Sequence, residues 1–94
     1  MNTDLFAQMA EKILRRHERI LGNVAIRQAV KIEGLKVDPQ TYLVSFEGDK
    51  KVLVEKLILQ YEKILGGVSI VLSKEAVKDI VPQVPPDQIP QLLL

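Results

Sequence analysis

His17 is the only histidine in the chain, and it is the first residue to consider for catalysis because imidazole titrates near neutral pH. A catalytic histidine works with a second group, such as a nucleophile or a paired acid. The sequence contains no cysteine and no recognisable arrangement of nucleophile, base and oxyanion donors. A single histidine also cannot complete a metal site made of protein ligands alone. We therefore expect a half-buried ring with its polar end at the surface, no enzyme activity, and no metal or cofactor.

Two acids, Glu18 and Glu62, occupy matching places in two similar stretches of the sequence. They would form a functional pair only if the fold brought the two carboxylates together. Each acid is followed directly by a basic residue, Arg19 or Lys63, and this mixture of charges is typical of a solvated helix face. We expect the solvated face.

Four basic residues form one stripe in helical projection and are the strongest local charge feature: Lys12, Arg15, Arg16 and Arg19. Such a stripe suits a solvated face, an acidic protein partner or the phosphates of a nucleic acid. The formal net charge is only +1, and the sequence has neither an aromatic stacking platform nor a glycine-rich phosphate loop. Binding to nucleic acid is therefore the less favoured use of the stripe.

The histidine and the acids lie in a stretch that occurs twice. His-Glu-Arg-Ile-Leu-Gly-Asn-Val-Ala-Ile at 17–26 returns 44 positions later as Tyr-Glu-Lys-Ile-Leu-Gly-Gly-Val-Ser-Ile at 61–70. The same offset pairs Glu-Lys-Ile at 11–13 with Glu-Lys-Leu at 55–57. Self-similarity at a fixed spacing indicates an internal duplication. We expect repeats at about 5–37 and 49–81 within one domain that spans 1–81.

In each repeat an apolar stripe at three- and four-residue steps precedes a glycine, which predicts an amphipathic helix. Glycine enters the left-handed conformation at little cost, so Gly22 and Gly66 should end these helices and form tight corners. The stripes contain Phe6, Met9, Ile13, His17 and Ile20 in one repeat and Leu53, Leu57, Tyr61 and Ile64 in the other.

Each corner should join two helices into an αα-hairpin. The first helices are expected at 4–21, with Thr3 as N-cap, and at 50–65, with Asp49 as N-cap. The second helices are expected at 24–33, closed by Gly34, and at 68–80. Residues 68–72 also alternate as a strand would, but the matching segment of the first repeat fits a helix, and we therefore favour a helix.

Residues 35–46 should form a β-hairpin between the repeats. Asp38 and Pro39 suit the first two positions of a type I turn, and β-branched and aromatic residues flank them. Tyr42, Val44 and Phe46 would share one face. A two-stranded ribbon is marginal alone, so it must lie on helices or pair with another subunit, and we expect it to be the dimer seam.

The last segment, 82–94, holds four of the five prolines and cannot be one regular helix. We expect an extended or polyproline-like tail, which either packs across the body or is free. Leu92 and Leu93 would dock on a partner or cover the chain's own core, and the sequence leaves both uses open.

The two corners have the sequences Ile20-Leu21-Gly22-Asn23-Val24-Ala25 and Ile64-Leu65-Gly66-Gly67-Val68-Ser69. They resemble a helical module with a Leu/Ile-Gly-Pro-Ile/Val-Ala corner that is attached to bacterial signalling proteins such as kinases and response regulators. Both corners lack the proline, and Ser69 replaces the alanine in the second. The resemblance implies a non-catalytic signalling or interaction accessory, here as a free-standing tandem.

Composition limits the remaining possibilities. The 94 residues are 47% hydrophobic, which excludes wholesale disorder, and no cysteine is available for disulfides or zinc. Neither a secretory signal nor a run of apolar residues long enough for a membrane span is recognisable, so we expect a cytoplasmic protein. Residues 1–37 carry seven basic and four acidic side chains, and residues 38–94 carry six and eight. This polarity favours head-to-tail docking of halves or subunits.

The sequence thus predicts a mainly α fold with two αα-hairpins related by approximate two-fold symmetry, a small β-hairpin between them and a proline-rich tail. The expected function is a small protein–protein interaction or signalling module, homodimeric, which uses the hairpin or the tail as its contact surface. The alternative is a nucleic-acid-associated regulator that uses Arg15, Arg16 and Arg19.

Overall fold

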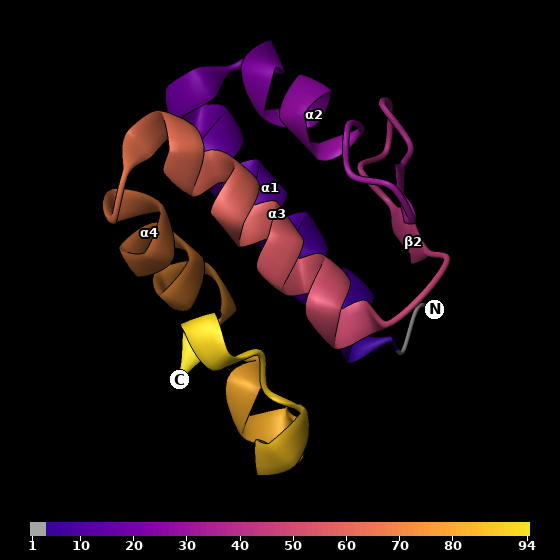
Figure 1. Ribbon diagram of the computed structural model, residues 1–94, viewed down its shortest axis with the longest axis vertical. Coiled ribbons are helices and arrows are strands. Elements are labelled where there is room, and N and C mark those ends of the chain that lie inside the picture. The colour runs from indigo at the N-terminus through magenta and orange to yellow at the C-terminus, as the bar shows by residue number, and fades with distance from the viewer. Residues whose placement is uncertain (1–3) are drawn as a thin grey trace.

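The structure, a computed structural model, describes residues 4–94 and is mainly helical (Figure 1). In chain order, a two-stranded antiparallel hairpin comes between two helix pairs, and three short 3₁₀ turns form the C-terminal segment. The α-helices are α1 (Leu5–Leu21), α2 (Asn23–Ala29), α3 (Lys50–Leu65) and α4 (Val68–Val77).

Both long helices begin at an aspartate. Asp4 is the N-cap of α1, and its Oδ1 accepts hydrogen bonds from the backbone N–H groups of Phe6 (3.0 Å) and Ala7 (3.2 Å). The cap is therefore one residue later than predicted, and Thr3 itself lies outside the described residues. Asp49 caps α3 as predicted, because its Oδ1 accepts from Val52 N–H at 3.1 Å. Each cap satisfies backbone donors that have no partner within the helix.

Helices α1 and α3 lie side by side and run in the same direction (Figure 1). At their N-terminal ends, Lys50 Nζ of α3 lies 2.7 Å from Asp4 Oδ2. Near their C-terminal ends, the rings of His17 and Tyr61 stack with centroids 4.1 Å apart. The acid beside Lys50 also offsets the unfavourable position of a cation in the first turn of α3. Contacts at both ends therefore keep the two helices in register.

The two corners have the same backbone arrangement. Gly22 (φ 59°, ψ −138°) follows α1, and Gly66 (φ 72°, ψ −155°) follows α3. The N–H of Gly22 donates to Glu18 O at 2.8 Å, and that of Gly66 donates to Glu62 O at 2.7 Å. Both glycines end a helix as predicted, but their ψ values lie outside the left-handed helical region, in a region that is open essentially to glycine alone.

The second helix of each pair ends earlier than predicted. Helix α2 stops at Ala29 and α4 at Val77, and turns follow each of them. Gly34 does not end α2. It precedes the hairpin with φ +90° and accepts a 2.7 Å hydrogen bond from Glu47 N–H, and an added Cβ would lie 2.6 Å from Glu47 O. Helix α2 therefore ends before Gly34, and the residues between them lead into the hairpin.

The hairpin pairs β1 (Leu35–Val37) with β2 (Val44–Phe46), with Leu35 opposite Phe46. The connection is longer than the predicted type I turn. Asp38 O accepts a hydrogen bond from Tyr42 N–H at 2.8 Å. Tyr42 has φ 62° and belongs to this connection, because β2 begins only at Val44. The N–H of Val44 donates to Glu11 Oε2 of α1 at 3.4 Å, and this bond ties the hairpin to the first helix.

The C-terminal segment packs against the helices. It forms the turns η1 (Val81–Gln83), η2 (Pro86–Gln88) and η3 (Gln91–Leu93) where an extended segment was expected, and η3 lies against α3 and α4. Gln91 N–H donates to Glu55 Oε1 of α3 at 2.7 Å. A 3₁₀ turn accommodates prolines better than an α-helix does, because proline at its first positions removes no internal hydrogen bond.

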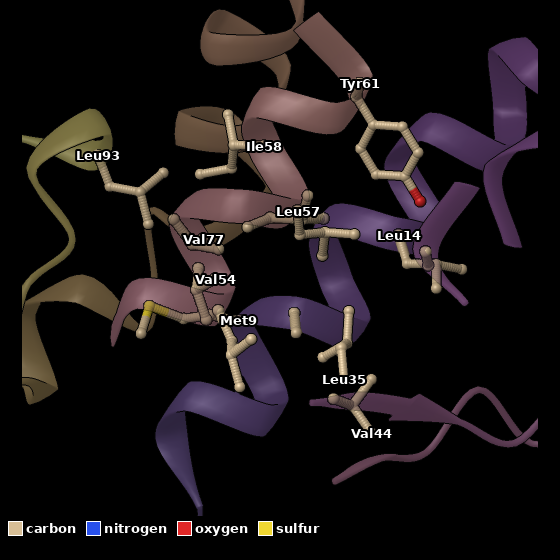
Figure 2. Packing of buried hydrophobic residues seen from close by; sticks show 14 of the residues in the cluster. Met9, Leu14, Leu35, Val44, Val54, Leu57, Ile58, Tyr61, Val77 and Leu93 are labelled. Atoms are coloured by element: carbon tan, nitrogen blue, oxygen red, sulfur yellow. The ribbon is translucent and has the colours of Figure 1, made fainter. Parts of the chain in front are cut away.

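One core joins all of these elements (Figure 2). Met9 and Leu14 come from α1, and Val54, Leu57, Ile58 and Tyr61 come from α3. Leu35 and Val44 reach the same core from the hairpin, and Leu93 reaches it from the last turn of the tail. The hairpin and the tail therefore bury apolar surface that the helices alone would leave exposed.

Candidate interaction surfaces

The ring of His17 is fully buried, which corrects the prediction of a polar end at the surface. It stacks on Tyr61, the residue 44 positions later, with an angle of 13° between the ring planes. The Tyr61 hydroxyl donates to Ala25 O at 2.7 Å. Because the side chain is buried and Glu18 adds negative charge nearby, the pKa of Tyr61 is raised.

The protonation of His17 follows from its contacts. Nδ1 lies 2.8 Å from Ile13 O, and a carbonyl only accepts, so Nδ1 carries the proton. Burial lowers the pKa of His17, although the bond to Ile13 O partly raises it, and the neutral ring is therefore favoured. Nε2 is buried without a partner among the described residues, as are the hydroxyls of Ser69 and Ser73. A ring without access to solvent cannot meet a substrate, and its geometry favours a structural role.

The basic stripe of α1 is partly held by contacts within the chain. Arg15 donates to Thr41 O at 3.1 Å and lies over the ring of Tyr42, with Cζ 5.1 Å from the ring centroid. Arg16 forms an ion pair with Glu75 of α4 at 3.4 Å. Within residues 4–94, neither Lys12 nor Arg19 has a salt bridge or hydrogen bond from its side chain. Two of the four cations are therefore fully available for a partner.

This stripe lines an open groove of about 300 Å³, groove one. A second groove of about 310 Å³, groove two, lies between α3 and the turns after α2. All five residues of groove one correspond, 44 positions along, to residues of groove two. The pairs are Lys12 and Lys56, Arg15 and Leu59, Arg16 and Gln60, Arg19 and Lys63, and Ala76 and Ile32.

The two grooves differ in chemistry. At matching positions in their linings, groove one has Arg15 and Arg16 whereas groove two has Leu59 and Gln60. Leu59 is 42% exposed, and Gln60 is held by a 2.7 Å hydrogen bond to Gln28. Groove two also contains Lys31 and Glu33. Groove one is thus lined mainly by basic side chains, and groove two combines the apolar Leu59 and Ile32 with basic side chains.

A third surface lies at the two corners. Large aliphatic side chains are exposed there at matching positions of the two pairs: Ile20 and Ile64, and Val24 and Val68. Both corners lie at the same end of the molecule (Figure 1). The periodicity placed Ile20 and Ile64 on the apolar stripes, but they lie beyond the ring stack and are 54% and 44% exposed. We call these four residues the corner face.

The interaction residues predicted from the sequence are mostly in use within the chain. Val44 and Leu93 are buried in the core, and Tyr42, Phe46 and Leu92 pack partly against it. The hairpin face proposed as a dimer seam and the tail proposed as a docking peptide thus cover the chain's own core. The corner face was missed, although the repeated sequence around Gly22 and Gly66 marks its position.

Comparison of the chain with protein families, curated proteins and solved structures finds no match. The geometry is therefore the basis for any functional argument. Among residues 4–94 no three potential ligand residues gather into a metal site. The helices of that part of the chain are too short or too polar to cross a bilayer.

Proposed function

We propose that this chain is a non-catalytic protein–protein interaction or signalling module, which self-associates into a homodimer through the corner face. The observation that carries the proposal is the exposure of matching aliphatic side chains at both corners, Ile20 with Ile64 and Val24 with Val68. Single exposed aliphatic residues are common, but a group of them at one end of a small protein is typical of an interaction site.

The proposal includes an internal duplication as the origin of the corner face. Four features recur 44 positions apart: the glycine conformation, the hydrogen bond that ends the helix, the bond from Ala25 or Ser69 N–H to the glycine carbonyl, and the lining of the grooves. The stack of His17 on Tyr61 joins matching residues of the two halves. These features support approximate two-fold symmetry with its axis between α1 and α3.

A second copy is the partner that this surface fits best. The aliphatic residues are flanked by Glu18 and Arg19 at one corner and by Glu62 and Lys63 at the other, so each corner carries both signs of charge. A surface that presents the same apolar residues and both charges twice is complementary to itself, as a two-fold dimer interface requires. Stable interfaces bury about 800 Å² per partner, so the contact would include these flanking charges.

Sedimentation equilibrium over a range of concentrations tests the proposal. We expect the wild-type chain to have twice the monomer mass at high concentration, and Ile20→Asp and Ile64→Asp each to make it monomeric. Leu43→Asp is the matched control, because Leu43 is as exposed as Ile20 (54%) but lies in the connection of the hairpin. A monomer at all concentrations, or dissociation by Leu43→Asp alone, would reject the corner face, and the second result would favour the hairpin as the seam.

A nucleic-acid-associated regulator remains the second candidate, because groove one is lined by Lys12, Arg15, Arg16 and Arg19 without an acid. Fluorescence anisotropy with duplex and single-stranded oligonucleotides tests it. Binding that disappears between about 0.05 and 0.2 M salt, and in a variant with the three arginines changed to alanine, would support this function. Arg15 and Arg16 already have partners within the chain, so we favour the protein interaction.

A further inference from the structure

Each groove has two cations at positions that match those of the other groove. Lys12 and Arg19 flank groove one, and Lys56 and Lys63 flank groove two at the matching positions. Residues seven apart on a helix are separated by about 10.5 Å along its axis, which is about two turns. A partner helix with carboxylates two turns apart would match that spacing. Both grooves therefore present basic side chains to an acidic segment.

Groove two offers more than charge. Its cations Lys31, Lys56 and Lys63 have no salt bridge within residues 4–94, and Glu33 is its only acid. Leu59 is 42% exposed and lines the groove together with Ile32, so an apolar side chain of a partner could pack there. In groove one the position of Leu59 is taken by Arg15, which is held on Thr41 and Tyr42. Of these two grooves, only groove two has an exposed leucine among cations that form no salt bridge within residues 4–94.

We infer that groove two docks an acidic amphipathic helix of a protein partner. An apolar residue of that helix lies on Leu59 and Ile32, and its carboxylates meet Lys31, Lys56 and Lys63. This is the helix-in-groove mode, in which buried apolar anchors give affinity and flanking charges give orientation. The inference rests on the proposed interaction function. The four aliphatic residues of the corner face do not line groove two, although Lys63 of groove two is next to Ile64 of that face.

Fluorescence anisotropy tests the inference with a labelled peptide of glutamate, alanine and leucine that is designed as an amphipathic helix. A second peptide has alanine in place of leucine, and a single-stranded oligonucleotide serves as a polyanion. We expect the leucine peptide to bind most tightly. The double substitution Lys56→Glu with Lys63→Glu should weaken binding at least about tenfold. The matched double substitution in groove one, Lys12→Glu with Arg19→Glu, should change it less than about twofold.

Leu59→Arg supplies a second measurement, because it places the residue type of groove one at the matching position in the lining of groove two. It should weaken binding of the leucine peptide and leave binding of the alanine peptide unchanged, while circular dichroism confirms the fold. The inference would be overturned if the two double substitutions weakened peptide binding equally, or if the leucine and alanine peptides bound with equal affinity. It would also be overturned if the oligonucleotide bound more tightly than the leucine peptide, or if that peptide did not bind. Sedimentation of the same variants separates the two proposals: peptide binding by a monomer would reject only the corner-face dimer, and a dimer without peptide binding would reject only groove two.

Discussion

The two halves of the molecule have the same order of helices but end in different segments. Each half has a long helix, a glycine corner and a shorter helix, and then a segment that covers the core. In the first half that segment is the hairpin, which donates Val44 N–H to Glu11. In the second it is the tail, which donates Gln91 N–H to Glu55, the residue 44 positions after Glu11. Glu11 and Glu55 thus each bind a segment that packs on the core, although one segment is a β-hairpin and the other consists of 3₁₀ turns. The position at which the segment is bound is therefore more alike in the two halves than its secondary structure.

The comparison predicts its largest effect in the core. Ile13 and Leu57 occupy matching positions and are both fully buried. Changing either to alanine should lower the free energy of unfolding by about 2–5 kcal/mol, because apolar contact is lost and a cavity remains. Urea denaturation measures both values. If the two halves contribute equally to stability, the decreases in unfolding free energy for the two variants agree within about 1 kcal/mol. A much larger difference would show that one half dominates the stability.

The corners should respond alike to the loss of glycine. Gly22→Ala and Gly66→Ala should each destabilise the chain by about 1–3 kcal/mol, because both residues occupy a backbone region that is open essentially to glycine. An added Cβ would meet nothing within 4 Å at either position, so conformation and not crowding sets the cost.

Gly67→Ala is the control for the corners, because Gly67 has helical φ and ψ and the same open space. We expect its effect on thermal unfolding to stay below about 1 kcal/mol. Loss of stability at only one of the two corners would argue that the corners are not equivalent.

The ring pair predicts a pH dependence that belongs to the first half alone. Burial lowers the pKa of His17, so the unfolded chain binds a proton at this histidine more tightly than the folded chain does. Protonation below pH 6.5 therefore favours the unfolded chain. Stability should therefore rise with pH up to the unfolded pKa of about 6.5 and level off above it, with a maximum slope of about 1.4 kcal/mol per pH unit.

His17→Phe removes this proton but keeps an aromatic ring on Tyr61. The difference in unfolding free energy between wild type and variant, measured from pH 5 to about 8, isolates the histidine from the carboxylates that titrate in both proteins. A difference that does not vary with pH would mean that His17 is protonated as easily in the folded chain as in the unfolded one.

The smallest effect is expected at the two acids that hold the covers. Glu55→Ala and Glu11→Ala should each lower the free energy of unfolding by about 0.5–1.5 kcal/mol, the net value of a typical hydrogen bond. Glu55 should matter more, because its bond to Gln91 N–H is 2.7 Å and that of Glu11 to Val44 N–H is 3.4 Å. Hydrogen exchange of those two amides locates the effect, and unchanged exchange at Gln91 in Glu55→Ala would contradict it.

Local chemistry in the sequence predicted the starts of α3 and α4 and the glycine at each corner. It failed at the ends of α2 and α4, because the turns after Ala29 and Val77 lead into the hairpin and the tail, and only packing fixes that change of direction. Periodicity likewise placed Ile20 and Ile64 on the apolar stripes, although both lie beyond the ring stack and are 54% and 44% exposed.

The grooves were partly predictable for the same reason. The basic stripe of groove one was found from helical projection, since four cations on one helix need no tertiary information. Groove two was missed, because Lys31 and Ile32 come from the turns after α2 and meet Leu59 of α3 only in the folded chain. The offset of 44 residues would have identified the α3 positions, but not the residues that face them.

Amide proton–nitrogen NMR spectra recorded over a dilution series test the central claim most directly, that the two corners form one self-complementary surface. The account predicts concentration-dependent shifts in residues 20–25 and in residues 64–69 together, with the amides of the hairpin and the tail unchanged. Shifts at only one corner, at the hairpin alone, or nowhere in the chain would contradict it.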